Sequence, residues 1–280
     1  MDKILIVGLG LIGGSYAKGL SKKGVKVYAY NRSKDAIDYA KKNNIIIDGT
    51  SRYDKDFISQ FDRIIFSLYP KIFKEYIHNY KDYFKDGTII SDVTGVKETI
   101  VNDIQKELGS NVEFIPAHPM AGKEVYGIEN SDEKIFKNAN YIITPTDRNT
   151  DKGIAFAKEI GTLLEFRKIS TLSPKEHDEM IAFLSQLTHC IAVSLMACKD
   201  SKYLVDYTGD SFRDLTRIAN INENMWSELF LMNKTALLRE MDLFINKISE
   251  LRDYIFNENE NKIKEMMKLS TARRNYFNKS

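Results

Sequence analysis

Three glycines near the N-terminus have the spacing of a phosphate-binding loop. The segment Gly8-Leu9-Gly10-Leu11-Ile12-Gly13 follows a short apolar run and precedes helix-forming residues. Gly8 permits a tight turn, Gly10 lets backbone N–H groups approach a pyrophosphate, and Gly13 allows close packing of helix on strand. The phosphates would then lie at the positive end of the helix, beside Leu11 and Ile12. The alternative is a glycine turn that binds no nucleotide. The strand–loop–helix–strand context favours a site for a nicotinamide dinucleotide.

The residues after the second predicted strand bear on which dinucleotide is bound. NAD-specific domains usually place Asp or Glu at this point to bind the ribose hydroxyls. Here the strand Val25–Tyr30 ends in Asn31-Arg32-Ser33, and no acid occurs before Asp35. Arg32 could pair with a 2′-phosphate and Ser33 could donate to it. Alternatively, Arg32 faces solvent and Ser33 only caps the following helix. We expect NADP to be accepted at least as well as NAD.

The chain has four histidines, and one of them is placed for proton transfer. His118 follows the predicted strand Val112–Pro116, where a doubly wound sheet presents its ligand crevice. An imidazole that titrates near neutrality suits a general base. His177 and His189 lie 12 residues apart, about 18 Å along a continuous helix, so both cannot hold the same small molecule. The histidines are scattered and no H-E-x-x-H motif occurs, so we expect no metal.

Alternating β and α patterns up to about residue 168 predict the elements that position these residues. The predicted fold is α/β, an N-terminal Rossmann domain with a doubly wound, mainly parallel sheet, followed by an all-helical C-terminal domain. The boundaries are 1–168 for dinucleotide binding and 169–280 for substrate binding and dimerisation. The expected strands are Lys3–Val7, Val25–Tyr30, Arg63–Ser67, Thr88–Ser91, Val112–Pro116 and Tyr141–Thr144. We also expect Ser67, where the third strand ends, to contribute to cofactor binding.

Helical periodicity dominates after Lys168. Ser173-Pro174-Lys175-Glu176 predicts a helix start with a capping box, and this helix should continue past Met196. A second long helix is expected from near Glu223 to near Tyr254.

Composition excludes several classes of protein. The 41 basic and 39 acidic residues leave a net charge of +2, which gives no electrostatic reason to expect nucleic acid or an anionic membrane. Two cysteines are too few for a disulfide framework, so a reducing cytoplasm fits best. No stretch was expected to reach membrane-spanning length without a charge.

Three further segments, taken with the glycine loop, resemble the prephenate dehydrogenase family of tyrosine biosynthesis. They are Ser91-Asp92-Val93-Thr94-Gly95-Val96-Lys97, Ala117-His118-Pro119-Met120-Ala121-Gly122-Lys123-Glu124 and Asp214-Leu215-Thr216-Arg217-Ile218-Ala219. His177-Asp178, His189 and Met225-Trp226 add to them. The resemblance runs nearly end to end. It implies oxidative decarboxylation of prephenate to 4-hydroxyphenylpyruvate with hydride transfer to NAD or NADP, in a cytoplasmic homodimer. Some members of the family prefer arogenate.

The resemblance also implies roles for individual residues. His118 corresponds to the catalytic base, Arg217 to the arginine that binds a substrate carboxylate, and His189 to a second substrate-binding histidine. His177, Glu124 and Arg213 match polar positions around the substrate, with His177 ranked below His189. Many members have serine where this chain has Gly95, and Thr94 could supply the missing hydroxyl.

Three alternatives stay open. Arg217 could be a helix arginine that pairs with Asp214. The enzyme could be an arogenate dehydrogenase, or another dehydrogenase of the hydroxy-acid or imino-acid type. From a different class, the chain could be a non-catalytic dinucleotide sensor, against which the presence of His118 and Arg217 argues.

Overall fold

The computed structural model describes residues 2–200 and 202–278. The chain divides into two compact units, one up to Asn233 and one from Lys234 onward. Every functional residue predicted above lies in the first unit.

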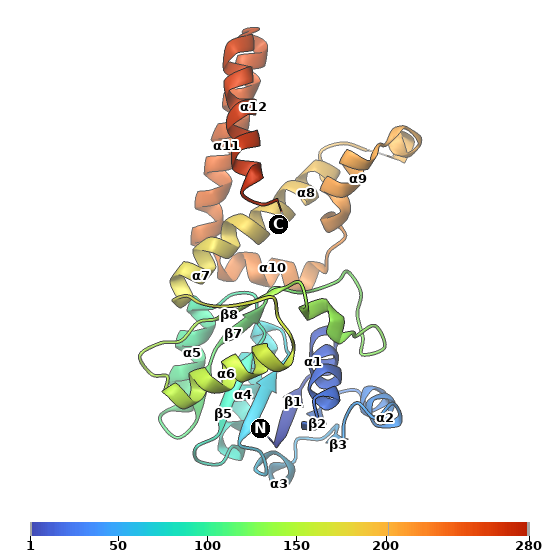
Figure 1. Ribbon diagram of the computed structural model, residues 1–280, viewed down its shortest axis with the longest axis vertical. Coiled ribbons are helices and arrows are strands. Elements are labelled where there is room, and N and C mark those ends of the chain that lie inside the picture. The colour runs from blue at the N-terminus through green and yellow to red at the C-terminus, as the bar shows by residue number, and fades with distance from the viewer. Residues whose placement is uncertain (1, 201, 279–280) are drawn as a thin grey trace. The chain divides into compact units, whose positions relative to one another are not determined.

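A six-stranded parallel sheet forms the centre of the first unit (Figure 1). Its order is β3-β2-β1-β4-β5-β6. The order reverses between β1 and β4, and a crevice for ligands opens at such a switch point beyond the carboxyl ends of the strands. The strands are β1 Lys3–Val7, β2 Lys26–Tyr30, β3 Asp48–Thr50, β4 Arg63–Phe66, β5 Ile89–Asp92 and β6 Glu113–Ile115.

Helices cover both faces of this sheet because successive side chains of a strand point to opposite sides. On one face, Ile4 and Ile6 of β1 pack with apolar residues of α1, α2 and α6. On the other face, Leu5 and Val7 pack with residues of α3, α4 and α5. The helices are α1 Leu11–Lys22, α2 Lys34–Lys42, α3 Lys55–Ile58, α4 Pro70–Tyr80, α5 Glu98–Leu108 and α6 Asp151–Leu163. The predicted doubly wound fold is confirmed.

A second, three-stranded sheet was not expected. It has the order β7-β8-β9, with β7 antiparallel to β8 and β8 parallel to β9. Its strands are β7 Ala117–Pro119, β8 Asn140–Ile143 and β9 Lys168–Thr171. Strand β7 carries His118, so this small sheet fixes the backbone of the expected base. Strand β9 crosses the domain boundary predicted at residue 168.

The helix that follows begins as the capping box predicts. The Ser173 amide donates to Glu176 Oε2 at 2.8 Å, and the Glu176 amide donates to Ser173 Oγ at 3.2 Å. The helix runs as α7 Pro174–Ile181, a π-helical stretch Ala182–Gln186, and α8 Leu187–Ala197.

The expectation that no stretch reaches membrane-spanning length without a charge does not hold for this helix. Within the described residues, Pro174–Ala197 is long and apolar enough to cross a membrane, with a mean hydropathy of 1.7. The same helix buries His177, Asp178 and Gln186 against other parts of the first unit, and 28% of its apolar window is buried.

The prediction of one long helix from near Glu223 to near Tyr254 is wrong in one respect, because the observed helix is interrupted at Asn233. Helix α10 covers Glu223–Met232, and α11 covers Lys234–Phe256. The buried Asn233 side chain donates to the Asp178 carbonyl oxygen at 2.9 Å and to Gln186 Oε1 at 2.8 Å. Asn233 therefore leaves the helical conformation to serve these acceptors. The first unit also contains α9 Asp210–Thr216, and the second unit pairs α11 with α12 Glu260–Asn275.

Candidate active site

The glycine loop has the geometry that a bound pyrophosphate requires. Gly8 has φ +99°, and a Cβ there would lie 2.4 Å from the Ser67 carbonyl oxygen. A Cβ on Gly13 would lie 1.9 Å from the Gly8 carbonyl oxygen, so helix α1 packs on the loop only without a side chain. Gly10 has open space around it, and no side chain caps the amides of α1. These amides are available to an anion at the positive end of the helix.

The end of β2 has no acid next to this loop. Asn31 Oδ1 accepts a hydrogen bond from the Leu9 amide at 2.9 Å, which ties the end of β2 to the glycine loop. Ser33 Oγ accepts from the Ala36 amide at 3.4 Å and so caps α2. Arg32 is exposed and has no hydrogen-bond or ion-pair partner among the described residues. Its guanidinium is therefore available to a ligand.

Three side chains form a hydrogen-bonded chain that ends at His118. His118 Nδ1 lies 2.9 Å from His177 Nε2, and His177 Nδ1 lies 2.7 Å from Asp178 Oδ1. A carboxylate only accepts, so the proton of neutral His177 is on Nδ1 and its Nε2 is an acceptor. His118 must then donate from Nδ1. The lone pair of neutral His118 is consequently on Nε2, the atom a base would use.

Asp178 also joins α7 to the start of α5. Its Oδ1 accepts from the Lys97 amide at 2.8 Å, and its Oδ2 accepts from the Glu98 amide at 2.8 Å. A carboxylate at a helix N-terminus satisfies free amides there and interacts favourably with the helix dipole. Asp178, which orients His177, is thereby held at the N-terminus of α5, a helix that packs on the large sheet.

The surroundings keep His118 unprotonated. Burial lowers the pKa of His118 well below its ordinary value, and His177 and Lys97 lower the pKa further. Burial also lowers the pKa of His177, although Asp178 opposes this shift. Both imidazoles are thus neutral at neutral pH.

Thr94 lies in the buried network beneath this chain. Its hydroxyl donates a short hydrogen bond to Asp92 and accepts one from Lys97 Nζ at 3.2 Å. The neighbouring Gly95 is the residue that borders His118, because a Cβ there would lie 3.8 Å from His118 Nε2. The single hydroxyl proton of Thr94 is already used by Asp92.

His189 lies in different surroundings from His177. Its ring stacks on Trp226 with centroids 3.7 Å apart, and its Nδ1 lies 2.9 Å from the Ser185 carbonyl oxygen. That contact places the proton on Nδ1 and leaves Nε2 unprotonated in the neutral ring. Burial lowers the pKa of His189, Glu124 raises it, and Arg217 lowers it. His189 therefore senses the charges of both Glu124 and Arg217.

Arg217 pairs with Glu124 rather than with Asp214. Its Nη1 makes a short ion pair with Glu124 Oε1, which links the loop after β7 to the segment after α9. Arg213 is exposed and pairs with Asp210 on its own helix, at 3.5 Å. The structure thus brings Arg217, Glu124 and His189 together and leaves Arg213 at the surface of its own chain.

Sequence reasoning did not assign Asp178, Lys97 and Asp92 to the site. Asp178 directly follows His177, and a carboxylate beside a histidine is a signal that could have been used. Lys97 and Asp92 stand in the quoted Ser91–Lys97 segment, but their burial could not be deduced from it.

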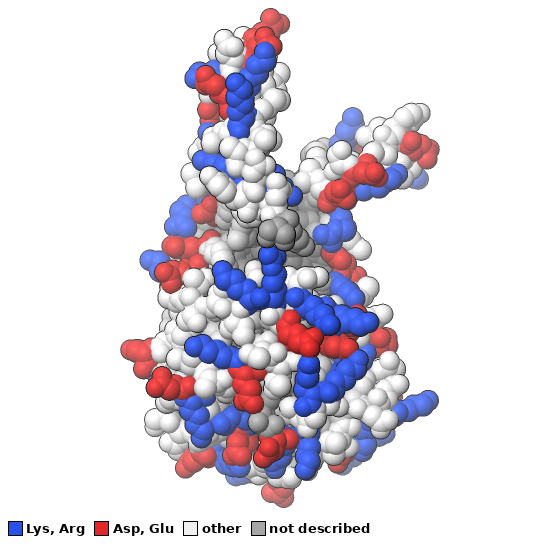
Figure 2. Space-filling model, viewed as in Figure 1, with Lys and Arg blue, Asp and Glu red and all other residues white. Residues whose placement is uncertain are grey.

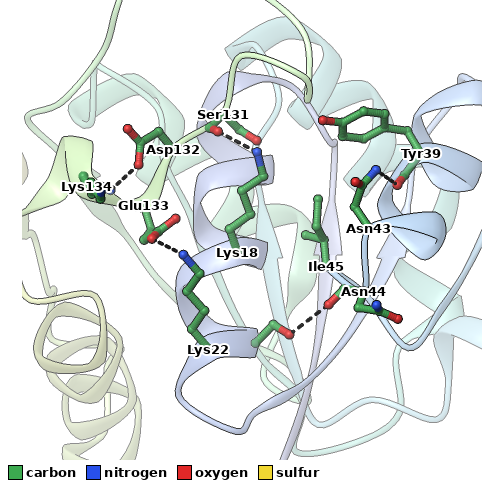
Figure 3. A pocket seen from close by; sticks show the side chains of 11 residues that line it. Lys18, Lys22, Tyr39, Asn43, Asn44, Ile45, Ser131, Asp132, Glu133 and Lys134 are labelled. Atoms are coloured by element: carbon green, nitrogen blue, oxygen red, sulfur yellow. Dashed lines mark hydrogen bonds and ion pairs between the residues drawn. The ribbon is translucent and has the colours of Figure 1, made fainter.

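Two described surface pockets lie away from the histidine chain. One has a volume of about 380 Å³ and is shown in Figure 3. In it, Lys18 Nζ donates to the Ser131 carbonyl oxygen at 2.6 Å, and Lys22 pairs with Glu133. The lysines of α1 that line it are already paired, so we assign no chemistry to this pocket.

The surface charge agrees with the small net charge. On the face seen in Figure 2, basic and acidic side chains are interspersed among uncharged ones, and acidic groups lie beside the basic ones. Such a surface gives no general attraction to a polyanion.

Comparisons with known proteins match both halves of the chain. The family model "Prephenate dehydrogenase, nucleotide-binding domain" matches residues 16–168, and "Prephenate dehydrogenase, dimerization domain" matches residues 173–269. The prephenate dehydrogenase of Bacillus subtilis is 30% identical over 92% of this chain and 71% of that protein. The cyclohexadienyl dehydrogenase of Zymomonas mobilis is 28% identical over 97% of this chain and 94% of that protein. The crystal structure of Aquifex aeolicus prephenate dehydrogenase with hydroxyphenyl propionate and NAD+ has a TM-score of 0.90 and 28% identity, and covers 99% of both chains.

Proposed function

The chain belongs to the prephenate dehydrogenase family, and we propose that His118 is the base with which it oxidatively decarboxylates prephenate to 4-hydroxyphenylpyruvate. The observation that carries this role is the chain from Asp178 through His177 to His118 Nδ1. It leaves His118 Nε2 as the only unprotonated nitrogen of that ring, beside Gly95, where a Cβ would lie 3.8 Å from this atom.

The reaction needs one proton acceptor and no metal. His118 Nε2 takes the proton of the ring hydroxyl, and the carbon that carries the hydroxyl loses a hydride. The opposite ring carbon then loses carbon dioxide, and the electrons of the broken C–C bond complete the aromatic ring and leave a phenolate oxygen. This oxygen takes the proton back from His118, which gives 4-hydroxyphenylpyruvate. A nicotinamide dinucleotide, which the glycine loop fits, supplies the hydride acceptor when bound. As His118 takes the proton, His177 and Asp178 stabilise the resulting imidazolium.

Two cationic or donor groups serve the substrate's carboxylates. We assign Arg217 to one of them, because a guanidinium binds a carboxylate in a bidentate way. Glu124 must give up part of its ion pair when that carboxylate arrives. We assign His189, in its protonated form, to the other carboxylate, because Nδ1 donates to the Ser185 carbonyl oxygen and Nε2 can donate only when it carries a second proton. We assign Thr94 to binding Asp92 and Lys97 rather than the substrate, since its single hydroxyl proton is already donated to Asp92.

Arg32 and the absence of an acid after β2 support NADP as a cofactor at least as good as NAD. Asn31 is neutral and held by the Leu9 amide, so it does not repel a 2′-phosphate. Arg32 is exposed beside it. The test compares kcat/KM for both dinucleotides in the parent and in Asn31→Asp/Arg32→Ala. We expect the double variant to shift toward NAD. A parent that strongly prefers NAD would contradict this assignment.

Turnover is tested with prephenate and with arogenate, following the absorbance of the reduced dinucleotide. We expect His118→Asn to lower kcat by about 10²–10⁴-fold while dinucleotide affinity is kept. His78→Asn is the matched control, because the His78 side chain is 75% exposed and lies 3.4 Å from Glu107. A fully active His118→Asn enzyme would refute the assignment of the base.

The same assay separates the alternatives. Turnover of arogenate in preference to prephenate identifies an arogenate dehydrogenase, with His118 in the same role. Dinucleotide binding without turnover of either compound identifies a sensor.

We further propose a cytoplasmic homodimer whose contact surface is helical. Apolar side chains of the second unit are exposed, among them Leu243, Ile255 and Phe256 at 59%, 58% and 77%. An exposed apolar surface of this kind is usually covered by a partner. Light scattering of the parent should give twice the monomer mass, and Leu243→Glu should weaken the dimer. A monomeric parent would contradict the proposal.

A further inference from the structure

Lys97 is buried beneath the histidine chain and has no role in the reaction as derived so far. Its side chain is 0% exposed, and its Nζ has three acceptors: Asp92 Oδ2 at 2.6 Å, the Ala117 carbonyl oxygen at 2.6 Å, and Thr94 Oγ1 at 3.2 Å. An ammonium group has three N–H bonds, and all three are used here. Burial lowers the pKa of Lys97, and the ion pair with Asp92 opposes this shift. The three acceptors around Nζ, one of them a carboxylate, fit the ammonium form.

Lys97 contacts the chain neighbours of both histidines. Its ammonium holds the carbonyl of Ala117, the residue before His118. Its backbone amide donates to Asp178, the residue after His177. We propose that Lys97 is a positioning residue that holds His118 and His177 at hydrogen-bond distance and supplies the positive charge beneath them.

Asp92 completes this brace. Its Oδ1 accepts a hydrogen bond from the Ala117 amide at 3.1 Å, while Lys97 donates to the Ala117 carbonyl oxygen. The Asp92–Lys97 pair therefore binds both the N–H and the C=O of Ala117, the residue before His118. Strand β7 has only three residues, Ala117–Pro119, and a strand this short is weakly held by its own ladder. The Asp92–Lys97 pair therefore holds in place the backbone that carries the base.

The charge of Lys97 acts in the same direction as its geometry. The charged or titratable groups around His118 are Lys97 before α5, His177 and Asp178 on α7, and Asp92 at the end of β5. Lys97 lowers the pKa of both His118 and His177. Removing the ammonium should therefore raise the pH at which His118 takes up a proton.

This role rests on the proposed function, but it can be tested without turnover. The chain has four histidines, so ¹³C-labelled histidine gives four ring signals, and the His118→Asn variant identifies that of His118. The pKa of His118 is then measured in the parent, in Lys97→Met and in Asp92→Asn/Lys97→Met. The double variant is included because Lys97→Met alone leaves a buried unpaired carboxylate, which can prevent folding.

We expect the His118 signal to titrate at a higher pH in each Lys97 variant that folds and binds dinucleotide. The acid limb of kcat/KM should shift upward with it, and kcat should fall about tenfold or more because the base is less well placed. Lys74→Met is the control, since it removes an ion pair with Asp103 at 2.5 Å on the surface of α4 and α5. A folded Lys97 variant in which His118 titrates as in the parent would overturn the proposal. Failure of the parent to convert prephenate or arogenate would instead overturn the proposed function and leave the titration result standing.

Discussion

Replacing Asp178 with asparagine should disturb the proton order along the histidine pair while keeping the size and shape of the side chain. The Asp178 carboxylate accepts three hydrogen bonds: from His177 Nδ1 at 2.7 Å, from the Lys97 amide at 2.8 Å and from the Glu98 amide at 2.8 Å. An asparagine offers one oxygen and one NH2 group, so it cannot accept all three.

The cost of the change follows from this mismatch. If the amide oxygen takes the place of Oδ1, the Glu98 N–H loses its acceptor, and if it takes the place of Oδ2, the buried Lys97 N–H does. A buried N–H without an acceptor costs about 1–3 kcal/mol of stability. When the NH2 group faces His177 Nδ1, the proton of His177 moves to Nε2. His118 must then accept at Nδ1 and carry its own proton on Nε2, where the base is needed. An imidazole held in the wrong tautomer by the same substitution lowers kcat by about 10⁴ in serine proteases, so we expect a loss of about 10²–10⁴.

The assay is kcat with prephenate, together with the thermal unfolding midpoint and dinucleotide affinity of the same preparation. Asp103→Asn is the matched control, because Asp103 is a 43% exposed carboxylate that pairs with Lys74. Parental kcat in a folded Asp178→Asn enzyme would show that the charge and second oxygen of the Asp178 carboxylate are not needed to set the tautomer of His118.

Three further outcomes are expected from the site. Arg217→Ala should raise KM for the substrate while dinucleotide affinity stays unchanged. A loss of dinucleotide affinity would show instead that Arg217 belongs to the dinucleotide site. Glu124→Gln should lower KM if the Arg217–Glu124 ion pair competes with the substrate. Folded-state pKa values of the site's three histidines are depressed by burial, so their contribution to stability is complete above about pH 6.5 and is lost as the pH falls below it. Urea unfolding from pH 7.5 to pH 5 should show this loss, and a flat profile would contradict it. Gly95→Ser should fold normally, because its Cβ would lie no closer than 3.7 Å to Leu229 and 3.8 Å to His118 Nε2, and a cooperative melt as in the parent checks it.

Five of the six strands of the large sheet could be predicted because each contains a run of apolar residues next to turn signals. Strand β3, Asp48–Thr50, was missed because it has no such run. The predicted strand Lys3–Val7 has the observed bounds, and each of the other predicted strands differs by one residue at one or both ends. Strands β7 and β9 were missed for a physical reason. Ala117–Pro119 has three residues and includes a proline, and Lys168–Thr171 is half exposed, so neither has an apolar pattern.

The contacts that organise the site are long-range, and no local pattern encodes them. Asp178 binds the Lys97 amide across 81 residues, and the helix break at Asn233 serves an acceptor 55 residues away. Asn233 has neither glycine nor proline beside it, so the sequence alone predicts an unbroken helix. The hydrogen bond of His177 to His118 could not be predicted for the same reason, since the two residues lie 59 positions apart in the sequence.

The π-helical stretch Ala182–Gln186 sets the phase between His177 and His189. A π turn takes up one more residue than an α turn, so the 12 residues between the two histidines advance the helix about as far as 11 α-helical residues would. Eleven α-helical steps come to about 1,100°, within roughly 20° of three full turns, so both imidazoles leave the helix on nearly the same side. The π-helical turn thus accommodates one extra residue without changing the side of the helix on which His189 lies. Losing one residue within it should cost the site less than gaining or losing one residue in α8 before His189, which would rotate that ring by about 100°.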